Sequence, residues 1–323
     1  MRLLSQSGTS APMFHCTYCL EKKPDSERSE EHVMPAALGG AWTTMDVCED
    51  CQTWANEEID HPFNQSLWVR EQRHRLGVPD RYGKVPEAPR VPAKVTDGRT
   101  AIVTLSPGGW ELELPPSTSP GTEGADSLQI TVSTDDEAEY IATKVKRFER
   151  ANPGFTYKTT KRELAPHGPL DVSFPFSIAM TLWPRFAVKV ALTVGREVYG
   201  EDWLTSEHGL LLNRLLWGRE TDVVMKPLPT KGAFWAGSTW SPPPDHVVMT
   251  MDGYTGPMML LTLFGEDSYG VPLGPTSPPP GGVAWVLHTH ERTHERLSTE
   301  DFITRIVASA APPHFNPMAD SKG

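Results

Sequence analysis

The four cysteines of this 323-residue chain constrain its fold most, because all of them lie within its first 51 residues. They form two Cys-x-x-Cys pairs, Cys16/Cys19 and Cys48/Cys51. Each pair offers two thiolates from one tight turn, and two pairs complete a tetrahedral zinc site that holds structure and does no chemistry. Two disulfides, or reduced thiols without metal, are the alternatives. We favour zinc because the first residues lack the apolar core of a secretory signal.

A carboxylate and an imidazole stand side by side between the two cysteine pairs. Glu31 and His32 precede Pro35 and the Gly39-Gly40 turn. Proline and paired glycines interrupt regular structure, so the Glu31-His32 pair is expected at the end of a short strand or hairpin. An acid and an imidazole at the end of a strand are a natural starting point for a catalytic site.

The residues after the second cysteine pair are predicted to form a helix over 49–59, ended before Asp60-His61-Pro62. Gln52 and Asn56 are four residues apart and therefore share one face of that helix. Zinc would hold the start of the helix against the hairpin. We therefore expect Gln52 and Asn56 to converge with the Glu31-His32 pair.

Over residues 16–63 the motifs C-x-x-C, E-H-x-x-P-x-x-L-G-G and C-x-x-C resemble those of the HNH endonucleases, the ββα-metal nucleases. The resemblance implies that His32 is the general base that activates water. It implies that Glu31 is a ligand of a catalytic divalent ion, with Gln52 and Asn56 as further ligands. The implied reaction is hydrolysis of phosphodiester bonds in nucleic acid, with DNA as the expected substrate. Oxygen ligands suit Mg²⁺ or Mn²⁺ for this step, whereas the thiolates select the structural Zn²⁺.

The chain departs from the family pattern in two places. Gln52 stands where Asn or His is usual, and its extra methylene moves the amide oxygen outward. The loop before the second cysteine pair has Thr43, Thr44 and Asp46, and no counterpart of the family asparagine. An active nuclease is our first hypothesis. The alternative is a catalytically degenerate HNH-fold zinc module that binds nucleic acid or a protein partner without cleaving.

Charge is distributed unevenly along the sequence. The net charge of −11 argues against a protein that coats nucleic acid without specificity. Basic residues nevertheless gather after the cysteine segment, on a predicted helix over 67–76 and in the proline-rich stretch that follows. We expect these side chains to bind nucleic-acid phosphates. The residues are Arg70, Arg73, Arg81 and Lys84.

The predicted fold class is α+β, with an N-terminal zinc-bound ββα-metal domain and a larger mixed α+β domain. The expected division is a disordered tail over 1–13, the HNH domain over 14–75, a basic linker over 76–94, the second domain over 95–311 and a loose tail over 312–323. Alternating and apolar runs predict the elements of the second domain. Strands are expected over 100–105, 110–114, 128–132, 247–251, 258–264 and 283–288, and helices over 134–151, 185–199, 205–217 and 298–308.

The second domain is expected to select or hold the substrate. A less favoured hypothesis makes it a small-molecule enzyme with the zinc module as an appendage. His288, His290 and His294 lie close to two glutamates there, but ordinary polar side chains at the protein surface are favoured over a metal site. No apolar run has the length of a membrane span, and four usable thiolates suit a reducing cytoplasm. The sequence leaves the oligomeric state open.

Overall fold

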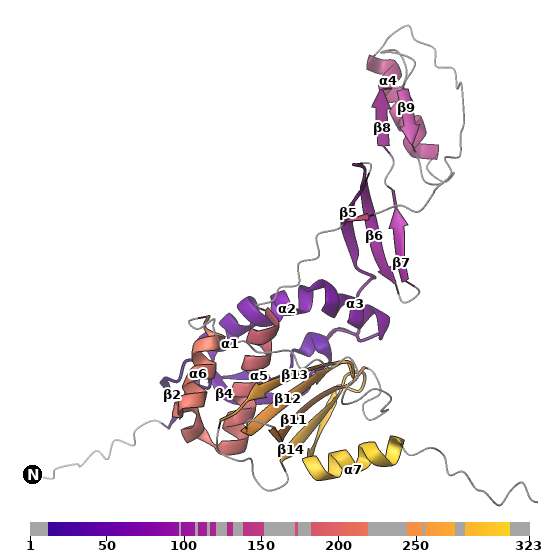
Figure 1. Ribbon diagram of the computed structural model, residues 1–323. Coiled ribbons are helices and arrows are strands. Elements are labelled where there is room, and N and C mark those ends of the chain that lie inside the picture. Colours follow the sequence, from indigo (N-terminus) through magenta and orange to yellow (C-terminus); the bar gives the residue numbers. More distant parts are fainter. Residues whose placement is uncertain are drawn as a thin grey trace, which may run out of the picture. The chain divides into compact units, whose positions relative to one another are not determined.

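The sequence of one structural unit is interrupted by that of another: residues 1–87 and 178–323 form the first unit, and residues 88–177 form the second. This division differs from the predicted one, in which the second domain ran continuously over 95–311. The computed structural model (Figure 1) describes residues 12–96, 98–106, 109–114, 117–120, 128–131, 138–151, 172–173, 182–218, 244–253, 256–274 and 282–310. The expected C-terminal tail and nearly all of the expected N-terminal tail lie outside these residues.

The first unit begins with two hairpins and a helical segment, the ββα order that the resemblance implied. In the second hairpin His32 pairs with Thr43 at the end nearest the turn. The turn is tight, because a Cβ on Gly40 would lie 1.9 Å from the carbonyl oxygen of Met34. The elements are β1 (Met13–His15), β2 (Lys22–Pro24), the 3₁₀ turn η1 (Asp25–Glu27), β3 (Arg28–His32), the 3₁₀ turn η2 (Ala36–Leu38) and β4 (Thr43–Cys48).

The helical segment after β4 runs further than predicted. It comprises α1 (Glu49–Ala55), the π-helical turn η3 (Asn56–Asp60) and α2 (His61–Gln65), and α3 (Leu67–Arg75) follows after Ser66. Pro62 was expected to end the helix before it. It instead lies in the first turn of α2, directly after the π-helical turn η3. The helix over 67–76 is confirmed as α3.

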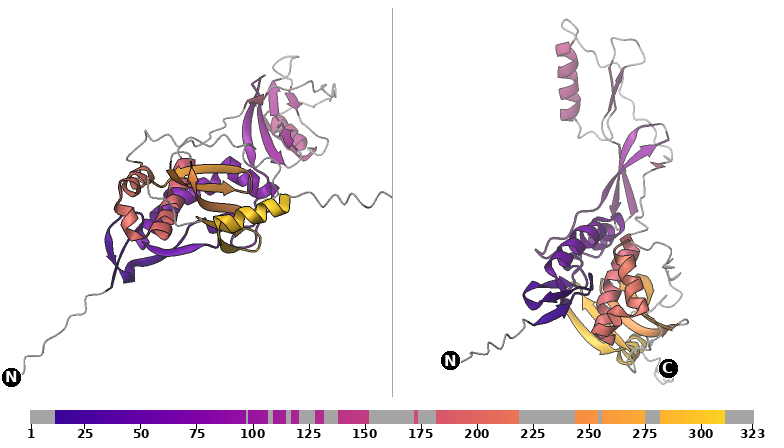
Figure 2. Two further views of the ribbon diagram at one scale, coloured as in Figure 1. Left: turned by 60° about the horizontal axis from the view of Figure 1, so that its bottom comes forward. Right: turned by 90° about the vertical axis from the view of Figure 1, so that its left-hand side faces the viewer.

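The rest of the first unit packs helices on both faces of an antiparallel sheet (Figure 2). Side chains alternate between the faces: Val247 packs in a cluster with Phe302 of the last helix, whereas Val248 packs in the cluster that includes Phe186. The sheet order is β13 (Asp267–Pro272), β12 (Gly256–Leu263), β11 (His246–Gly253), β14 (Val283–His288) and β15 (Thr293–Ser298). The helical elements are α5 (Leu182–Tyr199), the 3₁₀ turn η5 (Glu201–Thr205), α6 (Glu207–Leu216) and α7 (Thr299–Ala310).

One hydrophobic core joins the N-terminal segment to the later part of this unit. Phe63 stacks on Phe186 with ring centroids 4.0 Å apart, and Trp42 stacks on Trp285 at 4.5 Å. His246, fully buried, contacts the carbonyl oxygen of Leu38 through Nε2 at 2.9 Å. Burial of this kind is the main source of folding free energy. The residues around Glu31 and His32 therefore share their core with α5 and the sheet.

The inserted unit contains a small antiparallel sheet, a hairpin and a helix. Its strands over 100–105, 110–114 and 128–132 are confirmed within a residue or two, and the described part of the helix predicted over 134–151 begins at Ala138. Residues 134–137 lie outside the described residues. The elements are β5 (Arg90–Val95), β6 (Thr100–Ser106), β7 (Gly109–Glu113), β8 (Ser117–Pro120), β9 (Leu128–Thr131), α4 (Ala138–Ala151) and β10 (Val172–Ser173). None of the helices described in either unit is long and apolar enough to cross a membrane.

Candidate functional site

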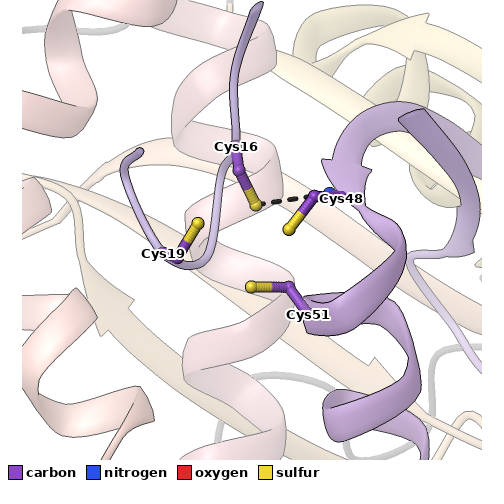
Figure 3. A group of neighbouring side chains, drawn as sticks. All are labelled: Cys16, Cys19, Cys48 and Cys51. Atoms are coloured by element: carbon purple, nitrogen blue, oxygen red, sulfur yellow. Dashed lines mark hydrogen bonds between the residues drawn. The ribbon is translucent and has the colours of Figure 1, made fainter. Parts of the chain in front are cut away.

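The four cysteines meet at one point between the first hairpin and α1 (Figure 3). Cys16 and Cys19 come from the turn between β1 and β2, Cys48 ends β4, and Cys51 lies in the first turn of α1. All four Sγ atoms lie within 4.8 Å of one another. A tetrahedral zinc ion with Zn–S bonds of about 2.3 Å requires sulfurs about 3.8 Å apart. The four residues thus fit a structural zinc ion.

The surroundings of Cys16 favour the thiolate form that zinc requires. A hydrogen bond from the Cys51 thiol, and then backbone N–H groups that include that of Cys48, lower the pKa of Cys16 to about 5 against the opposing effect of burial. The Cys48 N–H lies 3.4 Å from Cys16 Sγ. All four cysteines are free thiols in the structure, which contains neither of the two disulfides considered as an alternative. The predicted role of this cluster as a zinc site is compatible with its geometry.

Glu31 is engaged by a partner that sequence reasoning missed. Lys189, from the middle of α5, places its Nζ 2.6 Å from Glu31 Oε1 and 2.6 Å from Asp60 Oδ2. The same ammonium donates a hydrogen bond of 3.0 Å to the carbonyl oxygen of His32. Lys189 is 0% exposed and Glu31 is 2% exposed. The Tyr18 hydroxyl also donates to Glu31 Oε1, at 3.3 Å.

This buried cluster holds two carboxylates and one ammonium. Burial, and then the neighbouring Glu31, raise the pKa of Asp60 to about 6, although Lys189 acts in the opposite direction. Burial alone would lower the pKa of Lys189, but Asp60 and Glu31 outweigh it and the pKa is raised. One Asp60 oxygen, Oδ1, is buried without a hydrogen-bond partner among the described residues. Lys189 is therefore charged, and the cluster has one more acid than base.

His32 is half-buried at the end of β3, and its ring is kept neutral. Burial lowers its pKa below the ordinary 6.5, and the positive charges of Lys189 and Arg292 act in the same direction, against Glu30 and Asp60. Nδ1 is buried and has no hydrogen-bond partner among the described residues. A neutral imidazole near pH 7 has the chemistry of a general base.

Glu31 does not fit the metal-ligand role that the resemblance implied. Its Oε1 lies 2.6 Å from the buried ammonium of Lys189, which already supplies the positive charge beside this carboxylate. Of the two helix positions, Gln52 is half-buried and Asn56 is exposed. Convergence of these amides with Glu31 and His32 stays a prediction.

The four basic residues proposed for phosphate binding differ in exposure. Arg81 and Lys84 are exposed, and the Arg81 guanidinium lies 4.7 Å from the centroid of the Tyr82 ring. Arg70 is half-buried. Arg73 is only 8% exposed, and burial lowers its pKa. Arg73 is thus poorly placed to contact a phosphate at the surface, because its side chain is buried within the first unit.

In the histidine cluster near the C-terminus, His288 lies between two carboxylates. Its Nδ1 lies 2.8 Å from Asp245 Oδ2 and its Nε2 lies 3.4 Å from Glu295 Oε1. Asp245, His288 and Glu291 could each offer one ligand atom within 4.8 Å of the others. Carboxylates therefore lie beside both ring nitrogens of His288, and the preference for polar side chains over a metal site stays a prediction.

Comparison with known proteins bears on the N-terminal segment alone. The family model for the HNH endonuclease matches residues 16–68. No curated protein and no solved structure matches the chain. The matched residues contain both cysteine pairs, the Glu31-His32 pair and the helices that follow, and their order in the fold is ββα. The N-terminal segment of this α+β protein, residues 16–68, is therefore a domain of the HNH endonuclease family.

Proposed function

We propose that this protein is an HNH endonuclease that hydrolyses phosphodiester bonds in nucleic acid, with DNA as the expected substrate and His32 as the general base. The family match over residues 16–68 supports the reaction class. The observation that carries the assignment of the base is the half-buried, neutral imidazole of His32, whose pKa is lowered by burial. Such a group can take a proton from water at neutral pH.

The surrounding residues would hold the base in position. The backbone of His32 pairs with Thr43 across the hairpin, and its carbonyl oxygen accepts a hydrogen bond from Lys189. Because Nδ1 is buried, we assign proton uptake to Nε2. Zinc on the four cysteines would fix α1 against the hairpin. Because Glu31 does not fit a metal ligand, we assign no step to a divalent ion there.

A second candidate function is a non-cleaving HNH-fold module that binds nucleic acid or a protein partner. The ion pair between Glu31 and Lys189 favours it, because Glu31 is the residue that the family motif would use for the catalytic ion. Exposed Arg81 and Lys84 would serve such a binder as well as a nuclease. The two candidates differ in whether any phosphodiester bond is broken.

A plasmid-cleavage assay tests the proposal. Zinc-loaded protein is incubated with supercoiled plasmid in Mg²⁺, in Mn²⁺ and without added divalent ion. We compare wild type, His32→Ala and His61→Ala, the last being an exposed histidine of the same domain. Loss of a general base lowers the rate by about 10²–10⁴-fold. We expect that loss for His32→Ala and none for His61→Ala.

Two outcomes would speak against the nuclease as proposed. If His32→Ala nicks plasmid as fast as wild type, the base is misassigned. If no variant cleaves in any metal while zinc-loaded wild type binds DNA with a steep salt dependence, the chain is the non-cleaving module.

A further inference from the structure

Three oxygen atoms surround the ammonium of Lys189 inside the protein. They are Glu31 Oε1 and Asp60 Oδ2, each at 2.6 Å, and the carbonyl oxygen of His32 at 3.0 Å. An ammonium has three N–H donors and no acceptor, so this set uses every donor it has. The distances are those of charge-assisted hydrogen bonds. Lys189 is thus bound as completely as a lysine can be.

This oxygen set is one that a hard cation would choose. Two carboxylates and a backbone carbonyl are typical ligands of Mg²⁺, Mn²⁺ or Ca²⁺. Two neighbouring carboxylates out of contact with water also require positive charge, since unpaired buried charges are strongly unfavourable. An ammonium and a divalent ion cannot share this centre, because they need the same oxygens and repel each other.

The cation comes from outside the family domain. Lys189 lies on α5 within a run of buried residues that includes Phe186 and Val190. The family match ends at residue 68, so the carboxylates belong to the HNH domain and the ammonium does not. A lysine in an apolar helix face is costly to bury unless it is paired. The buried position of Lys189 is explained by its contacts with the Glu31, Asp60 and His32 oxygens.

We propose that the ammonium of Lys189 occupies a cation position formed by Glu31, Asp60 and the His32 carbonyl, and takes the place of a divalent ion at Glu31. The chain then needs a metal only at its four cysteines. Lys189 acts as a positioning residue for His32, because it binds the backbone of that residue and touches no substrate, being fully buried. This inference holds whether or not the domain cleaves nucleic acid.

Binding of Mn²⁺ tests the proposal directly. Zinc-loaded wild type, Lys189→Met and Lys84→Met are titrated with Mn²⁺, and free Mn²⁺ is followed by electron paramagnetic resonance. Lys84 is exposed and serves as the matched control. At about 1 mM Mn²⁺, a concentration at which weak protein sites fill, we expect no Glu31-dependent binding by wild type or Lys84→Met. We expect one equivalent bound by Lys189→Met and lost again in Lys189→Met/Glu31→Gln.

The same variants supply the results that would overturn it. Wild type that binds one Mn²⁺, with that ion lost in Glu31→Gln, would show that Glu31 is a metal ligand despite Lys189. Folded Lys189→Met that binds no Mn²⁺ would show that the oxygens do not form a cation site.

A folding defect in Lys189→Met is also informative. Recovery of a cooperative unfolding transition on addition of Mn²⁺ would support the proposal, since the ion would then replace the ammonium. Failure of Mn²⁺ to restore folding, while the neutral variant Lys189→Met/Glu31→Gln/Asp60→Asn folds, would refute it.

Discussion

Asp60→Asn should change how the stability of this protein depends on pH, with a sign opposite to that of most acidic residues. Burial and the neighbouring Glu31 raise the pKa of Asp60 in the folded protein from 3.8 to about 6. Between these two values the folded protein binds the proton more tightly than the unfolded chain. The stability that protonation of Asp60 contributes is therefore fully present below about pH 4 and is lost as the pH rises through about 6.

The magnitude follows from the size of the shift. A rise from 3.8 to about 6 corresponds to about 3 kcal/mol, since one pKa unit is worth about 1.4 kcal/mol. Asp60 is 5% exposed, so solvent screens this effect little. Asparagine keeps the shape and an oxygen acceptor for Lys189 but cannot ionise. The free energy of unfolding of Asp60→Asn, relative to wild type, should thus increase by about 3 kcal/mol from pH 4 to pH 7.

Urea unfolding at a series of pH values between 4 and 7.5 measures this difference, with the zinc content held constant. Glu57→Gln, an exposed residue of the same helical turn, controls for the loss of a carboxylate as such. If the difference in the free energy of unfolding between Asp60→Asn and wild type is the same at pH 4 and pH 7, the buried cluster does not have the charge balance that we describe.

Three further changes test other parts of the structure. Cys48→Ser should lose the zinc ion and the folded N-terminal segment together, because metal binding and folding are coupled in such modules, as zinc content and circular dichroism would show; a zinc-loaded, fully folded variant would contradict the site. Gly40→Ala should destabilise by about 2 kcal/mol or more in urea unfolding, because its Cβ would overlap the Met34 carbonyl oxygen at 1.9 Å, and an unchanged midpoint would count against that packing. If the chain cleaves, the acid limb of its pH–rate profile should have its midpoint below 6.5, since burial lowers the pKa of His32 and the base works only when neutral; a midpoint above 6.5 would be inconsistent with this.

Local sequence patterns predicted most of the elements but not how they assemble. The helix over 67–76 and the strand over 283–288 carry strong periodic or apolar signals, and both are present. In the five-stranded sheet, strands β13 and β15 were not predicted. Both are edge strands, and β15 in particular is mostly polar because only part of it faces the core. The pairing of Phe63 with Phe186 joins residues far apart in the chain, and no local pattern encodes which apolar faces meet.

The cluster of four cysteines was predictable because the spacing of its members is itself local. The surroundings of Glu31 were not, because Asp60 was interpreted only as the end of a helix and Lys189 comes from another part of the chain. One signal was visible: Lys189 is a single charge within the apolar run 186–194. A lone lysine in a buried helix face predicts that acidic partners exist, but the sequence does not identify them.

The ion pairs of Lys189 with Glu31 and Asp60 also constrain when the N-terminal segment can finish folding during synthesis of the chain. Asp60 and Lys189 are 129 residues apart, and the whole inserted unit lies between them. The HNH segment leaves the ribosome before Lys189 has been synthesised. At that stage it carries Glu31 and Asp60 but lacks the ammonium that pairs with them and the part of the core that α5 supplies. Contacts of such long range form late, because closing a long loop must precede them. The nascent HNH segment therefore completes its folding only after α5 has been synthesised. The site around Glu31 forms only when this helix packs against it.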